Sequence, residues 1–237
     1  MKSKYKLGCD PECFLFLDGQ PISAHDIIPG SKKEPFKVPR GFIQPDGLAA
    51  EFNIDPVDNP EDWLHNIEIV LDNLRYHVRK RDKNIEIRFT PYVEFDKDYF
   101  GTLPKDCKTL GCDPDFSYRG KANPSPDIID VPVRTAAGHI HIGWTENQDP
   151  KDAGHFEDCR FVAEYFYTRN VFRQETKEEQ ERINYYGMLG SFRAKSYGVE
   201  LRSPSNLWLK SRESRLKMYY KIMTHLENLD KEVQNAL

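Results

Sequence analysis

The sequence predicts an α+β protein with an antiparallel sheet, and two kinds of pattern lead to this expectation. Apolar residues recur at helical spacing in long segments, most clearly at 59–81 and 211–234. Shorter segments between them alternate apolar and polar residues, as strands with one buried face do. No low-complexity linker interrupts the 237 residues, so we expect a single domain that covers residues 1–237.

The composition is that of a globular protein without a strong charge bias. Hydrophobic residues make up 38% of the chain, and 34 basic residues are interspersed with 38 acidic ones to give a net charge of -4. We therefore expect no broad basic face, and nucleic acid is not favoured as a partner. No apolar run reaches the roughly 18–20 residues that span a bilayer, and no signal peptide is evident, so we expect no membrane association and a cytoplasmic location.

The cysteines predict reduced thiols and not a disulfide framework, because an odd number in a long chain with a sizeable core needs no such framework. A cysteine-rich zinc site is the less favoured alternative, since the spacing of the cysteines is not that of a zinc knuckle. The five residues are Cys9, Cys13, Cys107, Cys112 and Cys159.

The N-terminal part predicts a hairpin followed by a long loop. Residues 5–23 alternate as two strands, and Asp18-Gly19 between them suits a two-residue turn. Residues 24–47 and 101–135 are rich in glycine and proline, which predicts two irregular loops of a length that is often functional.

The helix at 59–81 has the clearest start, because Asn59 is a natural N-cap and Pro60 suits the first turn. Residues Ile85 to Phe95 alternate and predict one strand after it. Three more segments with helical spacing are 152–172, 177–185 and 211–234.

Four strand-like segments place polar side chains two residues apart, which points each pair to one face of a sheet and toward a common cleft. A sheet with one solvated face alternates in the same way, and for a single carboxylate pair this simpler interpretation is the stronger one. Together the pairs offer carboxylates and imidazoles, a set suited to Mg²⁺ or Mn²⁺. They are Asp10 with Glu12, Glu51 with Asn53 and Asp55, His139 with His141, and Glu200 with Arg202.

Four blocks in this order carry a resemblance to a known family. The sequence resembles the glutamine synthetase and glutamate-cysteine ligase superfamily, and within it the phage-type COOH-NH2 ligases (type 2). The resemblance implies a curved antiparallel sheet with helices on its outer face, and a bacteriophage origin. The matching blocks are GCDPECF at 8–14, DGLAAEFN at 46–53, RTAAGHIHIG at 134–143 and YYGMLGSFRAKSYGVELRSPSNLWL at 185–209.

The resemblance implies an ATP-dependent carboxylate-amine ligase that works with Mg²⁺ or Mn²⁺. In such enzymes a carboxylate takes the γ-phosphate of ATP, and an amine then displaces phosphate to form an amide bond. The implied metal ligands are Asp10, Glu12, Glu51, His139 and Glu200, with Asp46 as a further candidate. Whether two or three metal ions bind stays open.

The resemblance also assigns catalytic and ATP-binding residues. Arg202 matches an arginine that meets the γ-phosphate, and His141 matches a histidine at the phosphate or the substrate. The fork of Arg202 suits the charge that spreads over the transferring phosphoryl group. Charge alone adds Arg193 as a further catalytic candidate. It also adds further candidates for contact with ATP, for which ordinary solvated charge is the alternative: Arg134, Lys195, Lys37 and Arg40.

Two other functions stay open on the sequence alone. A phosphotransferase of related fold would use the same metals and stop after phosphorylating its acceptor. A non-catalytic phage accessory or binding protein would leave the polar face solvated. The carboxylate and amine substrates, small molecules or peptides, and the oligomeric state are not defined by the sequence, because fold alone does not specify them.

Overall fold

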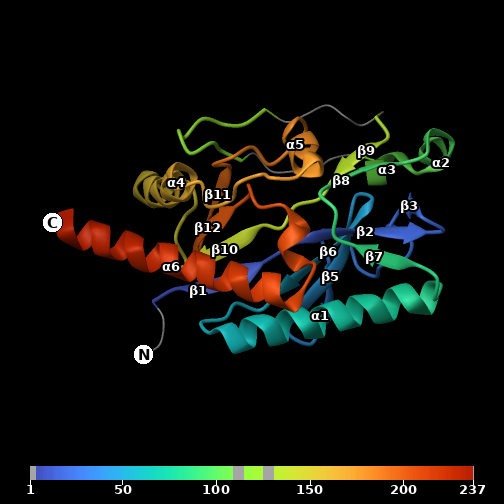
Figure 1. Cartoon of the computed structure of the whole chain (residues 1–237), viewed down its shortest axis with the longest axis horizontal. Coiled ribbons are helices and arrows are strands. Elements are labelled where there is room, and N and C mark those ends of the chain that lie inside the picture. Colours follow the sequence, from blue (N-terminus) through green and yellow to red (C-terminus); the bar gives the residue numbers. More distant parts are fainter. Residues whose placement is uncertain (1–3, 109–114, 125–130, 237) are drawn as a thin grey trace.

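The computed structural model describes residues 4–108, 115–124 and 131–236, and shows antiparallel sheets with helices packed around them (Figure 1). The α+β class with antiparallel pairing is thereby confirmed. One sheet has four strands in the order β1-β10-β12-β11. Their bounds are β1 (Lys6–Cys9), β10 (Ile140–Gly143), β12 (Gly198–Leu201) and β11 (Phe192–Lys195).

The remaining strands form two further sheets, so the single sheet that we expected is divided into three. The larger one runs in the order β3-β2-β6-β5-β4, with β7 paired to β2, and the smaller one joins β8 to β9. Their bounds are β2 (Glu12–Leu17), β3 (Gln20–Ile22), β4 (Phe36–Val38), β5 (Gly41–Asp46), β6 (Ala49–Ile54), β7 (Glu86–Arg88), β8 (Tyr92–Glu94) and β9 (Val133–Thr135).

The first expected strand passes from one large sheet to the other at Asp10-Pro11. Proline has no N–H to offer a ladder, so β1 ends before it and β2 begins after it. The two sheets stay joined near this point, because Leu7 and Val57 exchange backbone hydrogen bonds of 2.7 and 2.8 Å. The N–H of Glu12 also donates to the carbonyl of Ala137 at 2.9 Å.

The predicted hairpin turn is confirmed, but the prediction that residues 24–47 form an irregular loop is partly wrong. Asp18 and Gly19 have φ of 51° and 80°, as a two-residue hairpin turn with two left-handed positions requires. Residues 36–46 form the hairpin β4–β5. Its glycine serves close packing and not flexibility: a Cβ on Gly41 would lie 1.9 Å from the carbonyl oxygen of Asn53.

The strand expected from Ile85 to Phe95 is wrong, because Pro91 divides it into β7 and β8, which belong to different sheets. The second expected loop, 101–135, contains short helical turns and β9. Residues 109–114 and 125–130 of it, and with them Cys112, lie outside the described residues. The short helices are α2 (Lys97–Thr102) and α3 (Lys105–Lys108).

The expected longer helices are confirmed, with ends shifted by a few residues. Helix α1 packs on β5 and β6, α4 packs on β11 and β12, and α6 packs on α1 and on the short 3₁₀ helix η1 (Figure 1). Trp63 of α1 and Trp208 of η1 stack with their ring centres 5.6 Å apart. The bounds of these helices are α1 (Pro60–Arg81), α4 (Ala153–Thr168), α5 (Lys177–Ile183), η1 (Asn206–Leu209) and α6 (Arg212–Ala236).

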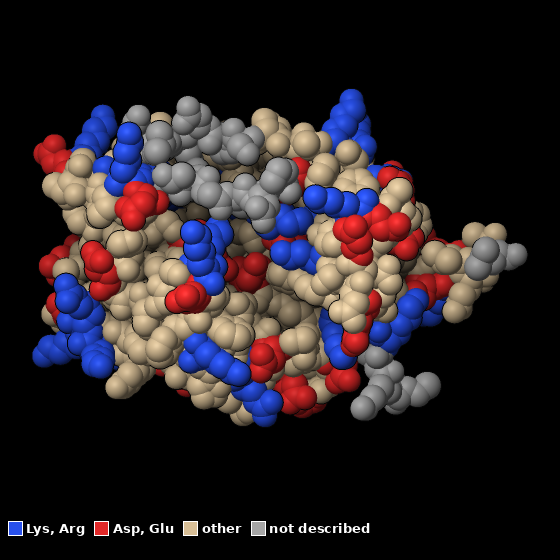
Figure 2. All heavy atoms as spheres, turned by 180° about the vertical axis from the view of Figure 1, so that it is seen from behind, with Lys and Arg blue, Asp and Glu red and all other residues tan. Residues whose placement is uncertain are grey.

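Within the described residues, no helix is both long enough and apolar enough to cross a membrane. The four cysteines that these residues include are all free and buried, as reduced thiols should be. Figure 2 shows acidic and basic side chains intermingled on the face seen from behind, with no broad basic region there.

The N-cap of α1 gives a direct test of the fold. The side chain of Asn59 accepts a hydrogen bond from the N–H of Asp62 at 2.8 Å. Asn59→Ala should lower the free energy of unfolding by about 1 kcal/mol, measured by urea denaturation. Asn59→Ser should restore most of the loss, because serine caps equally well, whereas the exposed Asn84 replaced by alanine should change little. Equal stabilities for Asn59→Ala and Asn59→Ser would contradict the capping role.

Candidate functional site

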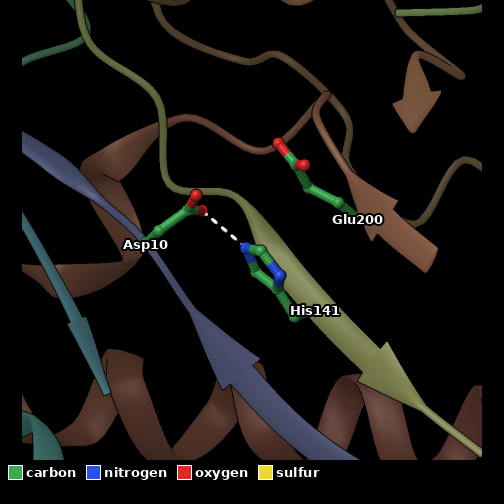
Figure 3. Close-up of side chains that lie close together, drawn as sticks. All are labelled: Asp10, His141 and Glu200. Carbon is green, nitrogen blue, oxygen red and sulfur yellow. Dashed lines mark ion pairs between the residues drawn. The ribbon is translucent and has the colours of Figure 1, made fainter. Parts of the chain in front are cut away.

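The four-stranded sheet brings together Asp10, His139, His141 and Glu200, which we call the histidine cluster. Figure 3 shows three of them, Asp10, His141 and Glu200. In the strand register His141 lies between Gly8 on β1 and Glu200 on β12, so these residues share one face. Oδ1 of Asp10 lies 2.8 Å from Nε2 of His141 and 3.3 Å from Nδ1 of His139. Nδ1 of His139 is also 3.6 Å from Oε1 of Glu200. The cluster is thus assembled from three distant parts of the chain.

Burial and charge act against each other on these groups. Burial acts to raise the pKa of Asp10, but attraction to His141 and His139 outweighs it and holds this pKa well below its usual value. Burial lowers the pKa of His139, and the nearby Arg202 lowers it further. Burial also acts to lower the pKa of His141, but the negative charge of Asp10 outweighs burial, and the pKa of His141 is raised. Asp10 is therefore an anion that both imidazoles face.

Glu200 departs from the expectation that it faces an open cleft, because its side chain is fully buried (0% exposed). Three cations cover it: Nη1 of Arg193 and Nζ of Lys195 each lie 3.2 Å from its Oε2, and Arg202 contacts its Oε1. Arg202 is also almost fully buried, and its Nε donates to Oδ2 of Asp115 at 3.0 Å. The buried carboxylate of Glu200 is stabilised by the positive charges that surround it.

A second group, which we call the carboxylate cluster, consists of Glu12, Asp46 and Glu51. Glu12 and Glu51 are direct partners across β2 and β6, and the cluster has one carboxylate oxygen from each residue within 4.8 Å of the others. Glu12 accepts from the N–H of Ala137 at 2.8 Å, and Glu51 accepts from the side chain of Gln44 at 3.0 Å. The strand register thus forces three acidic groups into one small volume.

These carboxylates repel one another in a buried setting. Burial and then the charge of Asp46 raise the pKa of Glu12 to about 8. Burial raises the pKa of Glu51 well above its usual value, and the charges of Asp10 and Asp46 add to the effect. Within the described part of the chain, Nζ of Lys32 lies 3.0 Å from Oδ1 of Asp46, and the charge of Arg182 acts to lower the pKa of Glu12. Protons or a bound cation must supply the remaining positive charge.

The donor atoms fit a divalent cation of the Mg²⁺ type. Carboxylate oxygens are the ligands that Mg²⁺ and Mn²⁺ favour, and an imidazole is acceptable to Mn²⁺. Oδ1 of Asp10 and Nε2 of His141, which lie 2.8 Å apart, are both atoms that can bind a metal ion. Asp10, His141 and Glu200 also have ligand atoms within 4.8 Å of one another. Both clusters therefore have the composition and spacing of a metal site.

A cavity of about 620 Å³ opens beside both clusters. Asp10 and His141 of the histidine cluster and Glu51 of the carboxylate cluster line it, together with Asn53. Its volume is in the range of about 300–1,000 Å³ that is typical of small-molecule sites. The structure therefore brings two of the predicted metal ligands, Asp10 and Glu51, to the wall of a space that can hold a ligand, whereas Glu12, His139 and Glu200 do not line it.

Several predicted residues lie elsewhere. The guanidinium of Arg134 donates to the carbonyls of Val133 and Lys108 at 2.5 and 2.7 Å and lies over the ring of Phe100. These contacts explain its burial without a ligand, so the structure does not support Arg134 as an ATP contact. Lys37 and Arg40 are exposed on the hairpin β4–β5, and Asp55 is exposed at the end of β6.

Four residues next to the clusters were missed by reasoning from the sequence. The hydroxyl of Tyr197 contacts Nδ1 of His141, and that of Tyr186 lies 3.5 Å from Nε2 of His139. Asp115 pairs with Arg202, and Gln44 bonds to Glu51. Both tyrosines lie in the sequence block at 185–209, close in sequence to Glu200 and Arg202, and this closeness could have identified them as candidates. Gln44 and Asp115 had no such signal, because each is isolated in a loop-like segment.

Comparison with known proteins adds no relative to this description: no family model matches the chain, and no curated protein matches it either.

Crowding in the carboxylate cluster predicts the effect of Glu51→Gln. The amide keeps the shape and removes the free-energy cost of burying or protonating this carboxyl at a pH where the unfolded chain ionises it. At pH 8 without divalent ions the variant should therefore melt roughly 2–4 °C higher, the shift that about 1 kcal/mol gives at this size. Mg²⁺ should stabilise the original protein and have little effect on the variant. Differential scanning fluorimetry with EDTA or Mg²⁺ measures both shifts.

Glu227→Gln is the matched control, because Glu227 is exposed on α6. This variant should respond to Mg²⁺ as the original protein does. An undiminished Mg²⁺ shift in Glu51→Gln would contradict the assignment of Glu51 as a ligand.

Proposed function

We propose that the protein is an ATP-dependent carboxylate-amine ligase that forms an amide or peptide-like bond through an acyl phosphate, on a fold of the glutamine synthetase type. The observation that carries the proposal is the convergence of two metal-competent clusters on one cavity, with three cations at Glu200. The order of the four sequence blocks supports the same family. Phosphoryl transfer needs this combination, because charge that develops on the phosphate oxygens must be offset.

Glu12, Asp46 and Glu51 would hold one divalent ion, and Asp10, His139, His141 and Glu200 would contribute to another. Bound there, the ions would neutralise the phosphate oxygens and keep ATP from meeting bare carboxylates. ATP needs these ions because its γ-phosphate would otherwise lie next to several carboxylates of the two clusters. ATP should therefore bind only together with Mg²⁺ or Mn²⁺.

The reaction consists of two displacements. A carboxylate oxygen of the acid substrate attacks the γ-phosphorus, the bond to the ADP oxygen breaks, and an acyl phosphate forms. The amine nitrogen then attacks the acyl carbon, phosphate leaves with the bonding electrons, and the nitrogen loses a proton. In this proposal Arg202, Arg193 and Lys195, which all contact the buried carboxylate of Glu200, would offset charge on the transferring phosphoryl group.

Phosphate release tests the proposal directly. Purified protein with ATP and Mg²⁺ should release phosphate only when both an acid and an amine are supplied, in a screen of amino acids, peptides, polyamines and proteins. The product should be an amide detectable by mass spectrometry. A stable phosphorylated acceptor without amide would support a phosphotransferase, and absence of ATP binding with Mg²⁺ would contradict the proposal.

Arg202→Lys separates binding from chemistry. Lysine keeps the charge but loses the planar fork, so turnover should fall by roughly 10²–10³-fold while ATP affinity changes much less. Calorimetry and phosphate release in one preparation measure the two quantities, and the melting temperature checks the fold. Arg75→Lys is the control, because Arg75 pairs with Asp72 on the exposed side of α1. An equal fall in affinity and turnover would contradict the role of Arg202 in the transition state.

A further inference from the structure

Each imidazole of the histidine cluster has one nitrogen that faces the carboxylates and one that faces away from them. Nδ1 of His139 and Nε2 of His141 approach the same atom, Oδ1 of Asp10, at 3.3 and 2.8 Å. Nδ1 of His139 is also 3.6 Å from Oε1 of Glu200. We call these two the inner nitrogens, and we call Nε2 of His139 and Nδ1 of His141 the outer nitrogens. The inner nitrogens thus converge on one carboxylate.

A tyrosine hydroxyl lies against each outer nitrogen. The hydroxyl of Tyr186 is 3.5 Å from Nε2 of His139, and the hydroxyl of Tyr197 contacts Nδ1 of His141. The two pairs are alike in spacing, because the ring centres lie 6.0 Å apart in the first pair and 5.9 Å apart in the second. One tyrosine precedes β11 and the other lies between β11 and β12. The same arrangement is therefore built twice from different segments.

The ring of Tyr186 is held by two buried arginines. Cζ of Arg202 lies 5.1 Å from the centre of this ring, and Cζ of Arg182 lies 5.7 Å from it. Arg182 is fully buried, and its guanidinium donates to the carbonyls of Arg202 and Ser203 at 3.1 and 2.9 Å. Gly187 leaves room for Arg182, since a Cβ at this position would lie 2.2 Å from Nη2 of Arg182. This packing fixes the position of the Tyr186 hydroxyl.

Tyr197 is held through the backbone of its turn. Its carbonyl accepts hydrogen bonds from the N–H groups of Trp144 and Thr145 at 3.0 and 3.2 Å. Sγ of Cys159 on α4 donates to the carbonyl of Gly198, the next residue, at 3.2 Å. The turn between β11 and β12 is thus anchored to the segment after β10 and to α4, which fixes the position of the Tyr197 hydroxyl.

We propose that Tyr186 and Tyr197 are positioning residues that direct the inner nitrogens of His139 and His141 to a divalent cation bound at Asp10. A histidine that binds a metal ion through one nitrogen carries its N–H on the other, and a hydrogen bond from that N–H fixes the orientation of the ring. The tyrosine oxygens accept from the outer N–H groups, so each inner nitrogen keeps its lone pair for the cation. The inference rests on the proposed function, because that function places a divalent cation at the histidine cluster.

A hydroxyl suits the electrostatics of this position. The outer partner of a metal-bound imidazole is often a carboxylate. A further carboxylate here would add negative charge beside Asp10 and Glu200, which already lie within one candidate metal site. A phenol oxygen accepts the same hydrogen bond without a charge. The two tyrosines therefore orient the imidazoles without increasing the repulsion between the buried carboxylates.

Tyr186→Phe and Tyr197→Phe test the proposal, because each removes one hydroxyl and keeps the ring. Each variant should bind Mn²⁺ at the histidine cluster roughly 10- to 100-fold more weakly, the usual cost of removing such a partner. The melting temperature should fall by roughly 2–4 °C at most, as for one lost hydrogen bond at this chain length. Tyr76→Phe is the matched control, because Tyr76 is 61% exposed on α1.

Pulsed EPR of Mn²⁺, with and without inorganic tripolyphosphate, makes this measurement specific to the histidine cluster. Mn²⁺ that is bound to an imidazole shows a coupling to nitrogen, which Mn²⁺ bound by carboxylates alone lacks. The original protein and Tyr76→Phe should show this coupling at the same Mn²⁺ concentration, and the two cluster variants should need more Mn²⁺. Absence of a nitrogen coupling in the original protein under both conditions would overturn the proposal.

NMR of the imidazole nitrogens gives a second readout, one that a purely stabilising role would not change. With Mg²⁺ and tripolyphosphate, the proton should lie on Nε2 of His139 and on Nδ1 of His141, so the two rings should give opposite patterns. In each phenylalanine variant the histidine that has lost its hydroxyl should exchange between two forms. Unchanged patterns in both variants would overturn the proposal.

The outcomes separate this inference from the proposed ligase activity. Weaker Mn²⁺ binding in both phenylalanine variants, without amide formation by the original protein, would support the positioning role and contradict the ligase. Amide formation by the original protein, with unchanged Mn²⁺ affinity in both variants, would support the ligase and overturn the positioning role. A lower melting temperature with full Mn²⁺ affinity would show that the hydroxyls only stabilise the fold, which would also overturn it.

Discussion

Negative charge concentrated where the two larger sheets meet is the constraint on which the rest of the structure depends. Five carboxylates, from Asp10, Glu12, Asp46, Glu51 and Glu200, lie in the two clusters. In a medium of low dielectric constant such groups can coexist only if positive charge or protons match them. The two clusters differ in how much of their negative charge the protein itself neutralises, and this difference indicates where a bound cation is needed.

The histidine cluster is largely neutralised by the protein itself. Three cations cover Glu200, and two imidazoles face Asp10, whose pKa is held well below its usual value despite burial. In the carboxylate cluster the structure describes one ion pair, between Lys32 and Asp46, and the pKa values of Glu12 and Glu51 are raised. A cation should therefore bind more readily at the carboxylate cluster, and the histidine cluster should depend more on the phosphates of a ligand to recruit one.

Local patterns predicted the helices well, because helices depend on spacing along one segment. They predicted the polar pairs only in part, since Asp10 and Glu12 lie in different clusters and Asp55 is exposed. The cap at Asn59 and the pair His139 and His141 are among the features that were predicted correctly. Division into three sheets was not predictable in the same way, since Pro91 and Pro11 each look like an interruption and not like a change of partner. The hairpin β4–β5 was missed because Gly41 is required for close approach of two backbones, a need that composition alone does not reveal.

The burial of Glu200 could not be predicted from its own strand. Alternation on β12 indicates which face it occupies, but its cover comes from Arg193 and Lys195 on β11 and from Arg202 beyond the strand end. Similarly, Arg134 has the residue type of a phosphate ligand, yet backbone carbonyls and Phe100 engage it. Charge type predicts what a side chain can bind, and only the tertiary neighbours decide whether that capacity is already used.

The position of the cavity follows from the same strands that build the clusters. Alternate residues run from Asp10, directly after β1, through Gly8 to Lys6 on β1, a distance of about 13 Å at the usual rise of a strand. Hydrogen bonds to β10 fix this row opposite His141 and Gly143, and β12 fixes His141 opposite Glu200. The charged end at Asp10 and His141 and the end at Lys6 and Gly143 are thus parts of one hydrogen-bonded ladder. A ligand that spans both ends would meet a surface whose spacing is set before it binds, which reduces the entropy that binding must overcome.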